Sequence, residues 1–328
     1  MHKHGGDIYR NQGVVDYSAN INFRGMPESV RQAAKDAIDA SVCYPDPQCE
    51  ELKAAIAEKE NVPAEWIFCG NGAADVIFSL VLALKPQKAL LPIPSFYEYR
   101  QALESVGCQI SEILLKEDEA FCLPKRFVNE IPMDTDMVCL CNPNNPTGQL
   151  IDREVLEQVA DYCQKTDTCL LLDECFHDFL EEGSMHTLLP RVKENPKLFV
   201  LRAFTKMYGM AGLRLGYGIC SDTELIRRME QVTQPWNVSV PAQAAGIAAA
   251  REQEFVAVSR QMITEQKKLL LAGLEAAGAK VYGSAANYIF FRAAPGFDTR
   301  MYRAGFMVRN CGNYDGLTEG FYRIAVRG

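Results

Sequence analysis

The chain has 328 residues, of which 48% are hydrophobic, enough to bury a large core and to form more than one lobe. Its formal net charge of −8 and the lack of any Lys/Arg-rich run argue against a nucleic-acid partner. The N-terminal residues contain no apolar signal region, and no apolar stretch is long enough to cross a bilayer. We therefore expect a cytoplasmic protein with no membrane partner.

Residues 1–25 show little periodicity, which predicts an N-terminal arm. Further along, short apolar runs that are typical of buried strands alternate with helical stretches such as Ala74–Leu84 and Arg153–Gln164. The strand candidates are Trp66–Cys69, Ala89–Ile93, Met137–Cys141, Cys169–Asp173, Leu198–Arg202 and Leu215–Cys220. Strands that are apolar on both faces and separated by helices indicate an α/β domain with a mostly parallel, covered sheet.

The C-terminal part has a different pattern. Gln253–Ala277 is a long helical stretch, and short alternating stretches follow at Asn287–Arg292 and Phe321–Arg327. They predict a smaller α+β lobe, joined through a helix around Pro27–Ser41. We expect a large domain over residues 42–235 and a small domain over residues 26–41 and 236–328, closely packed because no low-complexity linker separates them.

The twelve cysteines form no CxxC pair, and three of them, Cys139, Cys141 and Cys169, lie inside the predicted strands. This distribution favours small buried hydrophobic residues in a reducing compartment over a disulfide framework. Only four histidines are present, and none belongs to an HExxH pattern. We therefore expect no metal site.

Three small residues, Gly72, Ala73 and Ala74, follow a predicted strand and begin a predicted helix. Small side chains at such a turn let backbone N–H groups approach a phosphate at the helix N-terminus. A tight strand-to-helix turn also requires glycine for its own geometry, so this motif alone is more often structural. It does not match the GxGxxG pattern of dinucleotide-binding proteins.

Polar segments follow the next predicted strands. The segment Asn142–Gly148, with the sequence NPNNPTG, places amides at the carboxyl end of the sheet, where α/β folds bind ligands. The strand ending at Asp173 brings a carboxylate to the same edge, where it can raise the pKa of a protonated heterocycle nitrogen. For the neighbouring Glu174 we expect a solvated acidic loop.

Lys206 follows another predicted strand, and Arg214 comes shortly afterwards in the sequence GLRLGY. A partly buried lysine loses affinity for its proton and becomes a nucleophile for aldehydes. The planar guanidinium of Arg214 can clamp a phosphate. Neither residue is specific by itself, since an isolated lysine is nearly always a surface residue.

In this order and spacing, NPTG, an Asp that ends a strand, Thr-Lys and GLRLG resemble the class I/II aminotransferases over essentially the whole chain. The resemblance implies the aspartate-aminotransferase-like α/β fold (fold type I), with a mostly parallel seven-stranded sheet and a smaller α+β domain. It also implies pyridoxal 5'-phosphate as the cofactor. Lys206 would hold it as a Schiff base and move the α-proton, and Asp173 would pair with the pyridine nitrogen.

The same resemblance implies the remaining contacts. Asn145 would donate to the ring hydroxyl and Phe96 would stack on the ring. The phosphate would be held by Gly72, Ala73, Ala74, Thr205 and Arg214. Tyr44, in the sequence YPDP, resembles a tyrosine that reaches the phosphate of the partner subunit, which implies a homodimer with shared sites. Arg323, in YRIA, matches the arginine that binds the substrate carboxylate.

Within this superfamily the chain resembles most the pair formed by histidinol-phosphate aminotransferase and L-threonine-O-3-phosphate decarboxylase. Three segments favour the decarboxylase: the N-terminal HGG with the following DYSANIN, then PSFYEY, then DECFHDF, which has Phe176 where most aminotransferases have tyrosine. The first segment supplies His4 and Asn20 as candidate substrate contacts, and GFMVRNC supplies Arg309. Two features depart from the decarboxylase pattern: the stretch between HGG and DYSANIN is short, and Phe23-Arg24-Gly25 replaces Pro-Leu-Gly.

Two other classes of protein fit the sequence less well. A nicotinamide oxidoreductase needs a glycine-rich turn with an acidic residue about twenty positions later, and that pairing is absent. A regulator on this fold would tolerate loss of Lys206 and would usually add a basic DNA-binding domain. This sequence retains Lys206 and has no Lys/Arg-rich run that would indicate such a domain. We therefore expect a pyridoxal-phosphate enzyme that acts on a small, phosphorylated amino acid or amine. Decarboxylation of L-threonine O-3-phosphate is favoured, and amino transfer from histidinol phosphate to 2-oxoglutarate is the alternative.

Overall fold

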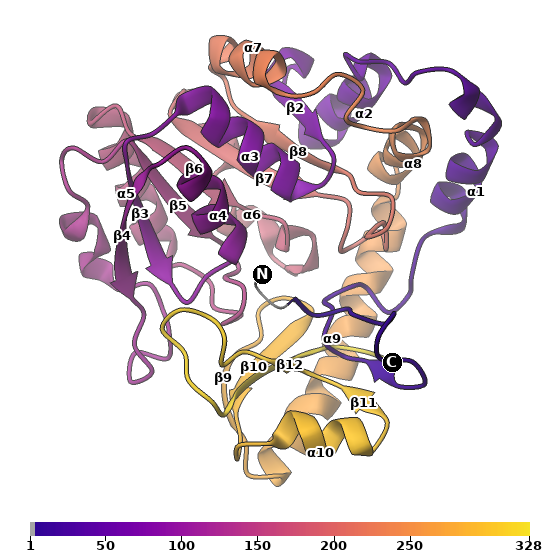
Figure 1. Cartoon of the computed structure of the whole chain (residues 1–328), viewed down its shortest axis with the longest axis vertical. Coiled ribbons are helices and arrows are strands. Elements are labelled where there is room, and N and C mark those ends of the chain that lie inside the picture. The colour runs from indigo at the N-terminus through magenta and orange to yellow at the C-terminus, as the bar shows by residue number, and fades with distance from the viewer. Residues whose placement is uncertain (1–3) are drawn as a thin grey trace.

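The computed structural model describes residues 4–328, so residues 1–3 of the predicted arm lie outside the described part. Figure 1 shows a larger lobe built on a twisted sheet and a smaller lobe formed mainly by the C-terminal segments. Helix α9 (Gln253–Ala276) begins beside the larger lobe and extends into the smaller one. No helix among residues 4–328 is long and apolar enough to span a bilayer.

The larger lobe contains a seven-stranded sheet in the order β2-β8-β7-β6-β5-β3-β4. The strands are β2 (Ile67–Gly70), β3 (Lys88–Ile93), β4 (Gln109–Leu114), β5 (Met137–Cys141), β6 (Cys169–Asp173), β7 (Leu198–Ala203) and β8 (Gly216–Ile219). All neighbours pair in parallel except β8, which is antiparallel to both β2 and β7. The predicted mostly parallel seven-stranded sheet is confirmed.

Strand β4 is the one member of this sheet that the sequence pattern did not predict. It lies at the sheet edge, pairs with β3 alone, and has partly or fully exposed residues along its whole length. Its sequence QISEIL therefore mixes polar and apolar residues, unlike the continuous apolar runs of β5 and β6. An edge strand needs fewer apolar residues because less of its surface is covered.

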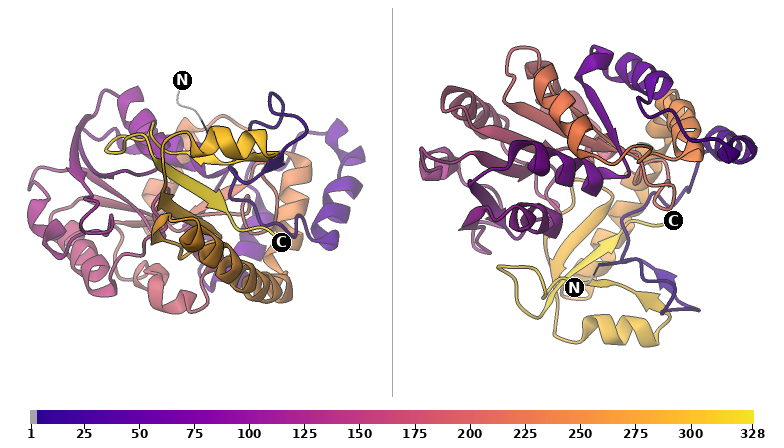
Figure 2. Two further views of the ribbon diagram at one scale, coloured as in Figure 1. Left: turned by 90° about the horizontal axis from the view of Figure 1, so that it is seen from below. Right: turned by 45° about the horizontal axis from the view of Figure 1, so that its top comes forward.

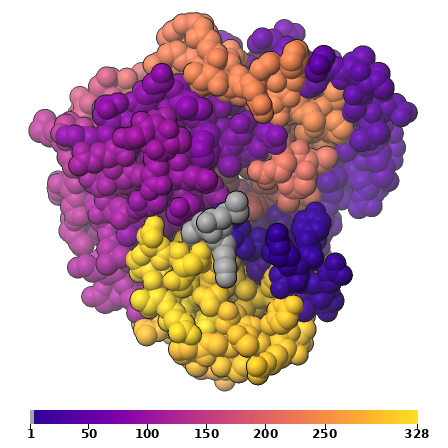
Figure 3. Space-filling model, in the orientation of Figure 1, coloured from indigo at the N-terminus to yellow at the C-terminus, as the bar shows by residue number. Residues whose placement is uncertain are grey.

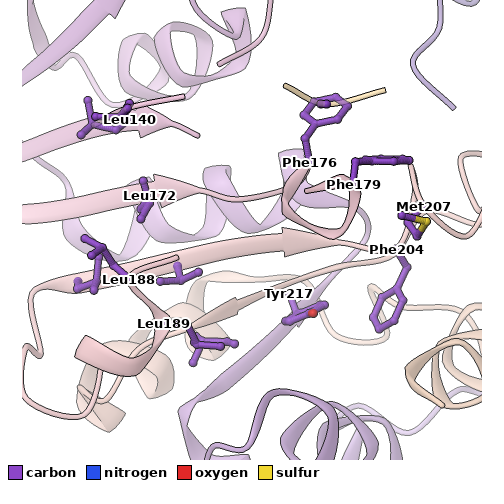
Figure 4. Close-up of a cluster of buried hydrophobic side chains, with 14 of the residues drawn as sticks. Leu140, Leu172, Phe176, Phe179, Leu188, Leu189, Phe204, Met207 and Tyr217 are labelled. Carbon is purple, nitrogen blue, oxygen red and sulfur yellow. The ribbon is translucent and has the colours of Figure 1, made fainter. Parts of the chain in front are cut away.

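Helices cover both faces of the sheet, which explains why its central strands are apolar on both sides. Helices α3 (Ala73–Leu84), α4 (Tyr97–Ser105) and α7 (Thr223–Val232) contribute to the core on one face, together with Cys139 and Leu171. Helices α2 (Glu50–Glu60), α5 (Arg153–Lys165) and α8 (Val240–Ala250) contribute on the other. Figure 4 shows Leu140 and Leu172 on neighbouring strands of that second face.

The smaller lobe contains a four-stranded antiparallel sheet in the order β12-β13-β10-β9. Its strands are β9 (Lys280–Gly283), β10 (Tyr288–Arg292), β12 (Arg309–Asn310) and β13 (Phe321–Ala325). Helices α9 and α10 (Phe297–Arg303) contribute apolar side chains to its core. In Figure 2 both helices lie beside the strands of this lobe. The expected smaller α+β lobe is present.

The N-terminal arm ties the two lobes together. Its strand β1 (Val15–Asp16) pairs in parallel with β11 (Phe306–Met307), so the arm lies against the C-terminal segment (Figure 3). Further along, the side chain of Asn22 donates to the backbone oxygen of Met207 at 2.9 Å. The arm thus contacts the segment that carries Lys206.

The predicted helix around Pro27–Ser41 consists of α1 (Glu28–Asp36) and a short 3-10 turn at Asp39–Val42. Helix α1 packs against α8, the helix that directly precedes α9 in the chain. The short helix α6 (Gly183–His186) lies in the connection from β6 to β7. The division of the chain at residues 42 and 235 stays a prediction.

Candidate active site

A cavity of about 290 Å³ lies at the edge of the large sheet where β5, β6 and β7 end. Segments distant in the sequence line it: His4, Ala73, Ala74, Phe96, Glu98, Cys141, Asn145, Asp173, Cys175, Phe176, Thr205, Lys206 and Arg214. Parallel strands bring their carboxyl ends to a common edge, and β8, which runs the other way, begins there. The fold therefore gathers nine of the residues that were expected to contact the cofactor or the substrate, together with Phe176.

Lys206 lies three residues beyond the end of β7, and its side chain is half-buried in the cavity wall. Its Nζ is 5.9 Å from the centre of the Phe176 ring. Burial and the nearby charge of Arg323 lower the pKa of Lys206 to about 8. A lysine with this pKa is uncharged in about one tenth of the molecules at pH 7, compared with well under one hundredth for an ordinary lysine, and only the uncharged amine is a nucleophile.

Asp173 is the last residue of β6 and is 4% exposed. The Tyr99 hydroxyl donates to its Oδ2 at 2.5 Å, and the backbone N–H of Cys175 donates to its Oδ1 at 2.9 Å. Burial raises the pKa of Asp173, although these two hydrogen bonds favour the charged form. A cation bound in the cavity would supply the remaining stabilisation of the carboxylate.

Arg214 lines the cavity next to the start of α3, and Gly72 lies against its guanidinium without lining the cavity itself. Gly72 has a φ of 84°, and a Cβ at this position would lie 2.5 Å from Nη2 of Arg214. No side chain caps the N-terminus of α3, which begins at Ala73. Backbone N–H groups at a helix N-terminus together with a guanidinium are suited to binding a phosphate.

Arg323 on β13 connects the smaller lobe to the cavity wall. Its Nη1 donates to Oδ1 of Asn145, and its Nη2 donates to the backbone oxygen of Ser18 at 2.9 Å. The side chain is buried, and its Nε has no hydrogen-bond partner within residues 4–328. Arg323 lies beside the cavity, behind Asn145, and contributes a positive charge that acts on Lys206.

Arg309 on β12 lines a second cavity of about 910 Å³, and His4 lines both cavities. The predicted substrate contacts His4 and Arg309 therefore both line the second cavity, and His4 alone also lines the first. Asn20 lines neither cavity: it is 2% exposed, and its backbone oxygen accepts a hydrogen bond from Asn287 at 3.2 Å.

Tyr44 lies outside the cavity of its own chain. It is 77% exposed and stacks on Trp236 with ring centres 4.2 Å apart. Val42, two residues earlier, is also exposed. In this position Tyr44 does not line the cavity of its own subunit. The role that the resemblance implies for Tyr44 therefore requires a partner subunit.

The expectation for Glu174 is wrong. This residue is 1% exposed, where we expected a solvated loop. Its Oε2 lies 2.7 Å from Nη2 of Arg202, and the hydroxyl of Thr187 donates to the same carboxylate. Arg202 is also buried and pairs with Glu60 at 2.9 Å. A buried arginine requires anionic partners, and Glu174 is one of them.

No role was expected for Tyr99 or Glu98 themselves, although their segment, PSFYEY, resembles that of the decarboxylase. Both residues lie in the first turn of α4, where Tyr99 reaches Asp173 and Glu98 lines the cavity. Their positions in the sequence did not reveal these contacts, because every helix with one buried face has residues at such positions. Within the described residues, no group of His, Cys, Asp and Glu is placed to hold a metal ion.

Comparison with known proteins gives matches over almost the whole chain. The family model for aminotransferase class I and II matches residues 12–326. Threonine-phosphate decarboxylase from Salmonella typhimurium is 36% identical, over 96% of this chain and 87% of that protein. Histidinol-phosphate aminotransferase 1 from Cupriavidus pinatubonensis is 32% identical, over 92% and 81%. Among solved structures, an aspartate aminotransferase double mutant from Thermus thermophilus superposes with a TM-score of 0.84 at 27% identity, over 98% and 89%.

Proposed function

Since this chain belongs to the class I and II aminotransferase family, we propose that it is a decarboxylase of L-threonine O-3-phosphate. Enzymes of this family depend on pyridoxal 5'-phosphate, which is therefore the cofactor of this enzyme. When bound, the cofactor withdraws electrons from the α-carbon of an amino acid, so that a bond to that carbon can break.

The residues of the cavity fit this cofactor. The buried carboxylate of Asp173 would hold the protonated ring nitrogen, and Tyr99 would keep that carboxylate in position. The N-terminus of α3 and Arg214 would hold the phosphate, where Gly72 leaves room for the guanidinium. Lys206, whose pKa is lowered to about 8, would hold the aldehyde carbon through its Nζ.

The substrate would be held by residues of both lobes. Arg323 would bind the carboxylate, since its guanidinium already lies against Asn145 at the cavity wall. The orientation of the substrate decides which bond is broken, because only a bond perpendicular to the cofactor ring is weakened. After carbon dioxide has left, the Nζ of Lys206 or a water molecule would return a proton to the α-carbon.

The observation that carries the choice of substrate is the place of the N-terminal HGG segment. His4 lies at the cavity with Nε2 3.4 Å from Oε1 of Glu98, and it also lines the second cavity together with Arg309. Two basic side chains beyond the carboxylate site are suited to a distal phosphate. Binding of that phosphate would fix the orientation of the carboxylate, so threonine itself should react poorly.

Amino transfer is the second candidate. It is supported by the 32% identity to a histidinol-phosphate aminotransferase, whose named substrate also carries a phosphate. The two candidates differ in their second substrate, because an aminotransferase needs an oxo acid as amino acceptor and a decarboxylase does not.

The test is the release of carbon dioxide from L-threonine O-3-phosphate in the absence of any oxo acid. We expect release at a rate at least about tenfold above that from threonine, because the phosphate supplies binding energy for orientation. The control reaction contains histidinol phosphate and 2-oxoglutarate. Amino transfer in the control without carbon dioxide from phosphothreonine would identify the enzyme as an aminotransferase.

We also propose a homodimer in which Tyr44 completes the site of the partner subunit. The exposed Tyr44, Val42 and Trp236 form an apolar patch that a partner would cover. Tyr44→Ala and Lys206→Ala proteins should each be nearly inactive. After unfolding and refolding of an equal mixture, half of the dimers would be hybrids with one intact site of two, giving about 25% of wild-type activity. Activity no higher than that of the parents, or a monomer in solution, would contradict shared sites.

A further inference from the structure

Glu98 is a carboxyl group in the cavity for which the proposed reaction has no assigned task. It lies in the first turn of α4, and its side chain is 14% exposed. One oxygen, Oε1, is 3.4 Å from Nε2 of His4. The other, Oε2, is buried and has no hydrogen-bond partner within residues 4–328. A buried carboxyl oxygen without a partner is unfavourable unless it is protonated or meets a ligand.

Charged and titratable groups face Glu98 from four other segments. They are His4 of the arm, Asp173 at the end of β6, Lys206 after β7 and Arg214 before β8. Burial raises the pKa of Glu98 to about 7, its own backbone N–H and Lys206 act in the opposite direction, and Asp173 raises it further. Near neutral pH, Glu98 is therefore divided between its charged and its neutral form.

A phosphate bound beside His4 would change this balance. Two negative charges in one partly buried site repel each other, which raises the pKa of the carboxyl group. The proton also turns Oε2 from an acceptor into a donor, and the phosphate dianion, which predominates above about pH 6, offers acceptor oxygens only. The favourable state of the complex is thus a neutral Glu98 that donates to the ligand.

We propose that Glu98 is a substrate-binding residue that takes up one proton from solvent when a phosphorylated amino acid binds, and that its neutral acid then donates a hydrogen bond to the ligand. This inference rests on the proposed function, because it places the substrate phosphate next to His4. An O–H bond forms on the Glu98 carboxyl group as a bond to hydrogen breaks in the proton donor, and no other covalent bond changes. The proton comes from water or buffer, the ligand keeps its charge, and the site becomes more positive by one unit.

The proton uptake has a defined dependence on pH. With a pKa of about 7 in the free enzyme, about one quarter of Glu98 is neutral at pH 7.5 and about nine tenths at pH 6. If the bound form is fully protonated, binding takes up about 0.75 proton at pH 7.5 and about 0.1 at pH 6. Above pH 7 the affinity should fall, reaching about 30-fold weaker at pH 8.5 than at pH 6.

The experiment uses the full-length enzyme loaded with pyridoxal phosphate and the ligand 3-phosphoglycerate, which has a carboxylate and a phosphate but no amine to react. Calorimetric titration in buffers with different ionisation enthalpies gives the number of protons taken up. For Glu98→Gln we expect no uptake and an affinity that does not change between pH 7 and 8.5. At pH 8.5 this variant should bind about 10- to 30-fold more tightly than the wild type, because the amide imitates the neutral acid.

Glu104→Gln is the matched control, since Glu104 lies on the same helix but its side chain is 52% exposed. It should behave as the wild type does. Weaker binding by Glu98→Gln at every pH would show a merely structural role and overturn the proposal, as would uptake that persists in this variant. Binding of 3-phosphoglycerate without proton uptake would overturn this inference alone. If neither 3-phosphoglycerate nor L-threonine O-3-phosphate binds, both this inference and the proposed function are overturned.

Discussion

Replacing Lys206 with alanine is expected to lower turnover by about 10³-fold or more, because the side chain serves both as nucleophile and as proton carrier. The variant should also lose covalent attachment of pyridoxal phosphate. In the wild type, reduction with borohydride should fix the cofactor to Lys206, and peptide mapping of the reduced protein should find the adduct on that residue. The lowered pKa of about 8 allows the reaction at neutral pH.

Lys267 provides an internal control for the same experiment. Burial lowers the pKa of Lys267 to about 8 as well, but its Nζ donates to the backbone oxygen of Ser284 at 2.6 Å, outside the cavity. If a low pKa alone decided attachment, both lysines would be labelled. We expect labelling at Lys206 only, and an adduct at Lys267 or no adduct at all would refute the assignment of the site.

Replacing Arg202 with methionine is expected to lower the free energy of unfolding by about 3–5 kcal/mol. The change leaves Glu60 and Glu174 without their shared cation, in a region where both carboxylates are buried. Urea denaturation of the wild type and the variant measures the difference. Arg227→Met is the control: Arg227 is exposed and pairs with Glu224 at the surface, so its loss should change stability by no more than about 1 kcal/mol.

The pH dependence of the free energy of unfolding is a second measurement of how the cluster of Arg202, Glu60 and Glu174 stabilises the fold. Burial raises the pKa of Glu60, but Arg202 and Lys59 outweigh it and lower the pKa to about 2. A depressed folded-state pKa gives stability that is present above about pH 4.5 and is lost as the pH falls towards 2. We expect Arg202→Met to lose most of this acid-dependent component. Equal stability of the two proteins at pH 7 would contradict the role of Arg202 altogether.

The buried charges also bear on the geometry of the active site. Glu174 directly follows Asp173, and Arg202 lies on β7 shortly before Lys206. The ion pair between Glu174 and Arg202 therefore links the two strand ends that carry the carboxylate for the ring nitrogen and the lysine. A shift of either strand end would move these groups relative to each other, so the cluster acts as a positioning element.

The sequence by itself determined the central sheet and the principal chemistry of the site. Strands β5 and β6 were predicted with their observed bounds because they are buried on both faces and therefore form uninterrupted apolar runs. Asn145, Asp173 and Lys206 follow or end such strands, and parallel pairing brings these ends to one edge. For these residues, local pattern and strand direction were sufficient to predict that they meet.

Only the tertiary structure decided which side chains contact one another across the fold. Tyr99 reaches Asp173 across 74 positions, and Arg323 reaches Ser18 across 305. Glu174 is buried because it pairs with Arg202, which lies on another strand. Glu98 lies next to His4 because α4 packs beside the N-terminal arm. Periodicity records which face of an element is covered but not which residue covers it, because that depends on packing between elements that are remote in the chain.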